Sequence, residues 1–75
     1  QDEYKTKDIG EAAALHSSGI KLLRLDKDSN FFWFIFESAQ AEEVSASYWS
    51  GDLIVKAKTY NDSFRSLKER VFSRG

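Results

Sequence analysis

The chain has 75 residues, of which 15% are aromatic, with no cysteine and a single histidine, His16. This length predicts one domain over residues 1–75 with a small core, and the composition excludes disulfides and any cysteine-based metal site. The formal net charge is −1, but residues 1–52 hold five lysines and arginines against ten acidic residues, whereas residues 53–75 hold six against two. The basic C-terminal part suits an anionic partner, or it serves to dock two parts of the chain, or two subunits, on each other.

The first predicted elements are a short strand and a helix. In residues 3–6, uncharged side chains alternate with charged ones, which predicts a strand. Asp8 and Glu11 have the spacing of a capping box, so a helix is predicted to begin near Asp8 and to end at Gly19.

A hairpin is predicted over residues 20–37. Residues 20–25 form its first strand, and the cluster Asp26–Asn30 has the polar side chains typical of a turn. Phe31–Glu37 forms its second strand, which contains five aromatic residues in an unbroken apolar run. Because successive strand side chains point to opposite faces, this strand has an apolar side on both faces of the sheet.

A second helix is predicted after the hairpin, with Ser38 as its N-cap and Gly51 at its end. Ala41, Val44, Tyr48 and Trp49 are expected to face inward. Residues 53–55 are short and β-prone, which allows a fourth strand.

The final predicted helix has the most regular apolar stripe in the chain. Thr59 and Asp62 form a second capping box, and Arg65 and Glu69 have the spacing of an i,i+4 ion pair. The apolar residues recur at intervals of four, three and four, at Tyr60, Phe64, Leu67 and Val71.

The order of elements predicts an α+β fold with a small antiparallel sheet centred on the hairpin and helices packed on one face. Two arrangements fit this order. One is a ferredoxin-like βαββαβ unit followed by a C-terminal helix, and the other is a plainer hairpin-centred sheet with three helices on one face.

Motifs spread over most of the chain carry a resemblance to a known family. They comprise Tyr4–Asp8, Glu11-Ala-Ala with Leu15, Gly19–Leu22, Phe34-x-Phe36, Tyr48-Trp49-x-Gly51, Ala57-Lys58 and Arg65-x-Leu67-Lys68. The pattern resembles a family of small domains of unknown function found in bacteria, phages and integrated elements. The resemblance implies short, soluble, intracellular proteins and supplies no catalytic residues to transfer to this chain, and it implies that Phe34 and Phe36 belong to the core.

Phe31 and Trp33 then point outward and are the first candidate site. Three interpretations stay open: cover by the chain's own helices, an interface with a protein or a second copy, or a platform on which nucleic-acid bases stack.

Six basic residues form the second candidate site, either as a solvated helix face or as a surface for nucleic-acid phosphates. These are Lys56, Lys58, Arg65, Lys68, Arg70 and Arg74.

The remaining patterns carry little chemistry. Asp26, Asp28, Asn30 and Glu37 match positions of a calcium loop, but Phe31 stands where that loop needs glycine, so no metal site is predicted. No catalytic motif, phosphate-binding glycine loop or cofactor site is evident, and neither a secretion signal nor a membrane-spanning run is present.

We therefore expect a cytoplasmic, non-enzymatic accessory protein that binds nucleic acid through the basic C-terminal helix, without a cofactor or a small-molecule substrate. The alternative is a protein-interaction module, a homodimer or an inhibitor of a host protein, that uses Phe31 and Trp33.

Overall fold

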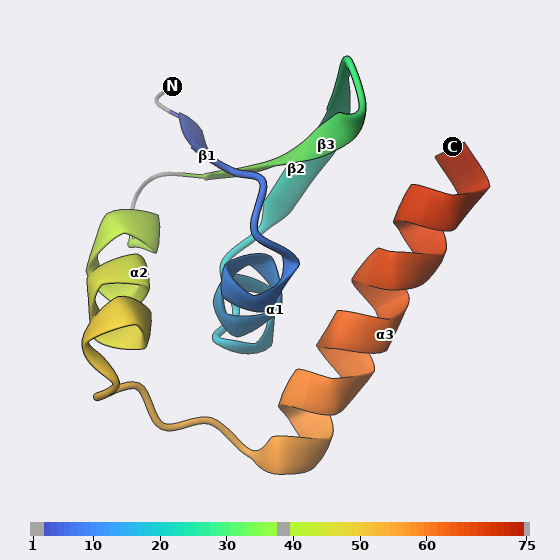
Figure 1. The fold of residues 1–75 in the computed structure, drawn as a ribbon. Helices are drawn as coiled ribbons and strands as arrows, with labels where there is room; N and C mark the ends of the chain where they lie inside the picture. Colours follow the sequence, from blue (N-terminus) through green and yellow to red (C-terminus); the bar gives the residue numbers. More distant parts are fainter. Residues whose placement is uncertain (1–2, 38–39, 75) are drawn as a thin grey trace.

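A computed structural model describes residues 3–37 and 40–74. Its three strands form one antiparallel sheet in the order β1-β3-β2, and its three helices lie on one face of that sheet (Figure 1). The predicted α+β fold is therefore confirmed. The elements are β1 (Glu3–Thr6), α1 (Ile9–Ser17), β2 (Leu22–Asp28), β3 (Phe31–Glu37), α2 (Ala41–Ser50) and α3 (Ala57–Arg74).

The hairpin has a tighter turn than the sequence suggests. β3 has its predicted bounds, but β2 continues to Asp28, so only Ser29 and Asn30 join the two strands. Charged residues are compatible with the end of β2, because one side of each strand faces solvent. Ser29 takes a positive φ of 54°, which lets the chain reverse within two residues.

The register of the sheet decides which aromatic side chains enter the core. Thr6 and Leu25 lie opposite Phe34, and Phe36 lies opposite Tyr4. Phe34 and Phe36 are buried, as the resemblance implied. A bulge between Leu22 and Arg24 adds one residue to β2. Leu22 and Leu25 are therefore on the same face of the sheet, opposite Phe36 and Phe34, and Leu25 is buried.

α1 is the central helix of the layer below the sheet. It packs against both α2 and α3, which flank it (Figure 1). Ala12, Ala13 and Ala14 are all buried, because small side chains allow α1 to approach the sheet and both neighbouring helices closely. The largest fully buried side chains are those of Phe36, Leu15, Ile35 and Leu67.

The predicted helix ends are partly confirmed. Asp8 caps α1 by accepting a 2.9 Å hydrogen bond from the backbone N–H of Glu11. Gly19 and Gly51 have φ angles of 92° and 85°, values that glycine adopts without a steric cost. Gln40 precedes α2 without a side-chain cap, and the predicted cap Ser38 lies outside the described residues.

The predicted fourth strand is wrong. Leu53, Ile54 and Val55 have no strand structure, and Ile54 is 92% exposed. This segment connects α2 to α3 at the end of the molecule away from the sheet (Figure 1), so it has no strand to pair with. The sheet keeps the split βαβ order, with β3 between β1 and β2, and the arrangement within the described residues is the plainer one.

Three smaller predictions for α2 and α3 are also wrong. Trp49 is 60% exposed instead of facing inward. α3 begins at Ala57, two residues before the predicted cap at Thr59, so Asp62 pairs with Lys58 at 3.3 Å. Arg65 and Glu69 form no ion pair.

Candidate functional site

The buried side of α3 determines where its basic residues can lie. Leu67 is fully buried, and Tyr60, Phe64 and Val71 pack against the core as predicted. Because the inward stripe uses one side of the helix, the charged residues occupy two flanks on either side of it.

We name one of these sides the basic flank and define it by Lys58, Arg65, Lys68 and Phe72. The last three line a hollow of about 370 Å³, with Asn61, Phe64 and Glu69. Lys58 lies two helical turns before Arg65 and therefore on the same side. Lys58 pairs with Asp62, whereas Arg65 and Lys68 form no ion pair with any described residue.

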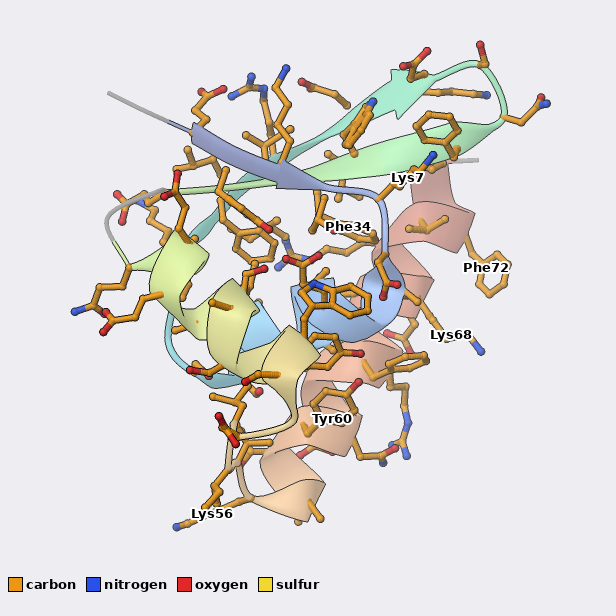
Figure 2. All side chains as sticks on the ribbon, turned by 60° about the vertical axis from the view of Figure 1, so that its left-hand side comes forward. Lys7, Phe34, Lys56, Tyr60, Lys68 and Phe72 are labelled. Carbon is orange, nitrogen blue, oxygen red and sulfur yellow. The ribbon has the colours of Figure 1, made fainter. Side chains whose placement is uncertain are left out.

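The structure does not bring all six predicted basic residues together. Arg70 lies on the opposite flank of α3, where it faces β2 across a second hollow. Lys56 precedes α3, and Figure 2 shows it at the end of the molecule far from Lys68. The side chain of Arg74 lies outside the described part of the chain. The predicted surface is thereby reduced to Lys58, Arg65 and Lys68.

Phe72 is a member of this surface that the sequence reasoning missed. Its side chain is 75% exposed and points away from the body of the molecule (Figure 2). The signal was its position directly after Val71, which places it outside the stripe of inward residues.

A neighbouring hollow extends from α3 towards the turn of the hairpin. It has a volume of about 290 Å³, and its lining includes Lys7, Phe31 and Val71. The Lys7 ammonium lies 4.8 Å from the centre of the Phe31 ring, a cation–π contact. Lys7 therefore adds positive charge near the C-terminal turns of α3.

The outer face of the sheet is less open than the aromatic run suggests. Phe31 and Trp33 are half-buried, and their rings lie edge to face with their centres 5.5 Å apart. Trp33 donates a 3.1 Å hydrogen bond from Nε1 to Asp28, and Asp26 lies opposite Trp33 in the ladder. Carboxylates this close repel phosphate, so the geometry does not favour base stacking on Trp33.

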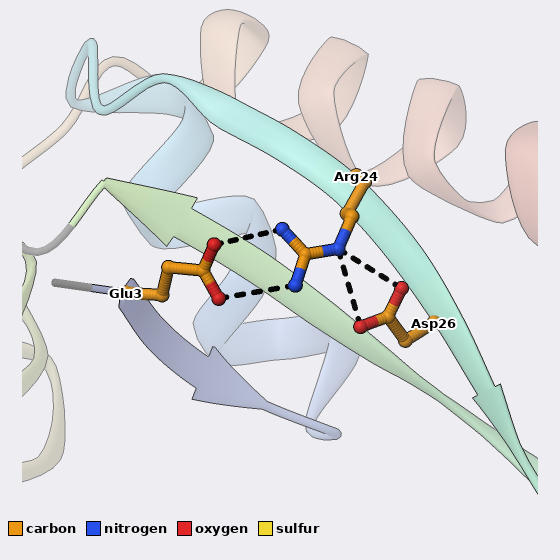
Figure 3. Close-up of polar contacts among 3 residues, drawn as sticks. All are labelled: Glu3, Arg24 and Asp26. Carbon is orange, nitrogen blue, oxygen red and sulfur yellow. Dashed lines mark hydrogen bonds and ion pairs between the residues drawn. The ribbon is translucent and has the colours of Figure 1, made fainter. Parts of the chain in front are cut away.

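An arginine covers the rest of this face (Figure 3). Arg24 on β2 donates to Glu3 on β1 at 2.8 and 3.0 Å and to Asp26 at 3.1 and 3.3 Å, so its side chain crosses β3. Ile35 lies between Arg24 and Lys5 in the register of the sheet, and it is fully buried. Hydrogen bonding from Arg24 lowers the pKa of Glu3, and the two carboxylates raise the pKa of Arg24.

A buried carboxylate lies below the other end of the sheet. Glu11 is 4% exposed, and it accepts hydrogen bonds from Tyr4 at 2.5 Å, from Thr6 at 2.7 Å and from Ser45. Burial raises the pKa of Glu11, but the hydroxyl donors outweigh burial, and the net pKa is lowered. The sequence reasoning assigned Glu11 to a helix cap and missed this cluster.

His16 joins α1 to α3. Its Nδ1 shares a 2.8 Å hydrogen bond with the Ser63 hydroxyl. Burial, and then the positive charge of Arg70, lower the pKa of His16.

The residues with calcium-loop spacing do not form one cluster in the structure. Asp26, Asp28 and Asn30 lie at or near the hairpin turn, whereas Glu37 lies opposite Glu3 at the other end of β3. Residues 3–37 and 40–74 contain no group of three or more His, Cys, Asp or Glu side chains arranged to hold a metal. No helix in this part of the chain has the length and apolar character needed to cross a membrane.

Together these features define a small α+β protein with three helices on one face of a three-stranded sheet and a basic flank on the last helix. The chain belongs to the family described as Domain of unknown function (DUF5659), which matches residues 1–73. No curated protein and no solved structure matches the chain. The resemblance to a family of unknown function is confirmed, and an origin in bacteria, phages or integrated elements stays a prediction.

Proposed function

We propose that this protein is a cytoplasmic, non-enzymatic accessory protein that binds the backbone of single-stranded nucleic acid through the basic flank of α3. The observation that carries the proposal is the position of Phe72. This three-quarters-exposed aromatic ring lines the same hollow as Arg65 and Lys68.

An exposed ring beside unpaired cations suits a flexible nucleic-acid strand. Proteins that bind single strands without sequence preference combine basic grooves for the backbone with aromatic rings on which bases stack, at about 1–3 kcal/mol per base. Lys7 extends the positive charge beyond the hollow. The flank has three cations, and Asn61 and Glu69 line the same hollow. We expect the cations to contact phosphate, which supplies affinity without reading the sequence.

The test is fluorescence anisotropy with a labelled single-stranded DNA of mixed sequence over a range of salt concentrations. We expect binding at low salt that weakens steeply as salt rises. The affinity is followed as the slope of log K against the logarithm of the salt concentration. The double variant R65E/K68E should make this slope shallower by about 0.7 for each phosphate contact that is lost. F72A should weaken binding with little change in the slope.

The matched control is the double variant K21E/K56E. It has the same change in net charge, and both lysines are exposed and lie off the basic flank. Equal weakening by both double variants would mean that net charge alone acts, and a wild-type protein that does not bind DNA at low salt would refute the proposal.

A protein-interaction module is the second candidate. Phe31 and Trp33 are half-buried, but Trp49 and Ile54 are 60% and 92% exposed near the end of α2. Exposed apolar side chains close together in sequence favour a contact with a protein or a second copy. Light scattering tests the homodimer: a concentration-dependent mass that W49A and I54S abolish supports it, and a monomer at every concentration refutes it.

A further inference from the structure

β2 is an edge strand with an open hollow beside it. Within residues 3–37 and 40–74 it pairs only with β3, so alternate residues on its other side direct N–H and C=O groups away from the sheet. The hollow beside this edge has a volume of about 610 Å³. Its lining comes from Leu23, Arg24 and Leu25 on β2 and from Ser66, Glu69, Arg70 and Ser73 on α3.

The α3 side of this hollow has room for side chains. Ser66, Arg70 and Ser73 are spaced four and three residues apart, so they form one row along the helix. The two serines are small, and Arg70 forms no ion pair with any described residue. A strand beside β2 would therefore meet two small side chains and the available guanidinium of Arg70, with the Glu69 carboxylate next to it in the lining.

We propose that this groove binds an extended, acidic peptide segment of a partner protein, which adds to the sheet beside β2 and pairs a carboxylate with Arg70. Main-chain hydrogen bonds to the edge of β2 supply affinity in this mode, and alternate side chains supply specificity. Arg24 is already paired with Glu3 and Asp26, so Arg70 is the cation in the lining that is available to a carboxylate of the partner. Glu69 lies beside it, so the proposal requires that carboxylate to be placed against Arg70 and not against Glu69. The inference is independent of nucleic-acid binding, because it uses the opposite flank of α3.

A second copy of the chain fits this groove less well than a single segment. Two-fold pairing of two β2 strands would continue the sheet and keep the helices of both copies on the same side of it. Since α3 lines the hollow at this edge (Figure 3), two α3 helices would meet below the paired strands. A peptide segment carries no such helix.

The experiment uses labelled peptides of about seven residues, the length of a typical strand. They alternate valine and threonine and carry a central glutamate, alanine or lysine. We expect the glutamate peptide to bind about tenfold more tightly than the alanine peptide, and R70Q to abolish this preference. S73W should block the groove, whereas S50W, at an exposed serine on α2, should leave binding unchanged.

Two further measurements locate the peptide. Hydrogen exchange should slow for edge amides between Arg24 and Asp28, and the pKa of His16 should rise when a carboxylate offsets the charge of Arg70. The double variant R65E/K68E should bind the peptide normally, which separates this site from the basic flank.

Several outcomes would overturn the inference. These are no binding of any peptide up to about 1 mM, binding that S73W leaves intact, or exchange protection at other strands. If hydrogen exchange at the β2 edge slows with rising protein concentration in the absence of peptide, the groove binds a second copy of the chain instead.

Discussion

Glu11 shows how a single residue joins several parts of this small fold. Tyr4 and Thr6 reach it from β1, and Ser45 reaches it from α2. No buried side-chain nitrogen or oxygen in the described residues lacks a hydrogen-bond partner. A carboxylate can be buried here because the hydroxyl donors replace the water that it loses.

Glu11→Gln should lower the free energy of unfolding by about 1–3 kcal/mol at neutral pH, because hydrogen bonds to a charged group are lost. The pKa of Glu11 is lower in the folded protein than in the unfolded chain. Its charge therefore stabilises the fold fully at a pH above the unfolded-state pKa, and this contribution is lost as the pH falls through the folded-state pKa. Urea denaturation should therefore show a smaller difference between the two proteins in acid. Glu43→Gln, at an exposed position on α2, is the control.

His16 should titrate below its ordinary pKa of 6.5, because burial and Arg70 both disfavour the imidazolium. The neutral form is the one that the fold stabilises, so this contribution is present above the unfolded pKa and declines as pH falls through the folded pKa. NMR can follow His16 without ambiguity, since the chain has one histidine.

Arg70→Gln should raise the pKa of His16 towards 6.5, while Lys68→Gln, on the other flank of α3, should leave it unchanged. A His16 pKa above 6.5 in the wild type would contradict the burial of the imidazole, and an unchanged His16 pKa in Arg70→Gln would contradict the proximity of Arg70.

At the scale of elements, the β2–β3 hairpin contains a residue poorly suited to its backbone. Ser29 has a φ of 54° in a two-residue turn, a conformation that disfavours a Cβ atom. Ser29→Gly should raise the free energy of unfolding by about 0.5–1 kcal/mol, as measured by urea denaturation. Ser18→Gly, at a φ of −87°, should give no such gain, and equal gains would indicate that the turn is unstrained.

The two sides of the sheet are covered by different kinds of side chain. The inner face packs against helices, whereas Arg24 covers Ile35 on the outer face through its pairs with Glu3 and Asp26. The aliphatic stem and planar head of an arginine can shield an apolar residue and stay in contact with water. A protein with helices on one face of its sheet can therefore reduce the apolar area that the other face exposes to water without a second layer of helices.

At the scale of the whole molecule, stability depends on α3 packing against α1 and the core. Leu67→Ala should cost about 2–5 kcal/mol because it opens a cavity at a fully buried side chain. A chain of this size is stable by roughly 4–11 kcal/mol, so the variant should be partly unfolded in mild urea.

Phe72→Ala, on the exposed side of the same helix, should change stability little, and this makes it a usable binding variant. A small effect of Leu67→Ala would mean that α3 can detach without loss of the remaining fold.

The sequence by itself determined the class of fold and most of its elements. Periodicity identified β1 and the inward stripe of α3, an unbroken apolar run identified β3, and glycine marked the ends of two helices, because these signals are local. The limits of β2 and the missing fourth strand were not predictable, because a strand also requires a neighbour with which to pair.

Only the tertiary structure decided which candidate residues share a surface. Five of the six basic residues, which are near each other in sequence, divide between two flanks of α3 and the segment before it, and Phe72 joins one flank. Asp26 and Asp28 meet Trp33 across the hairpin, and Ser45 reaches Glu11 from a position 34 residues away in the sequence. Their proximity depends on strand register and helix packing, which long-range contacts set and local patterns do not encode.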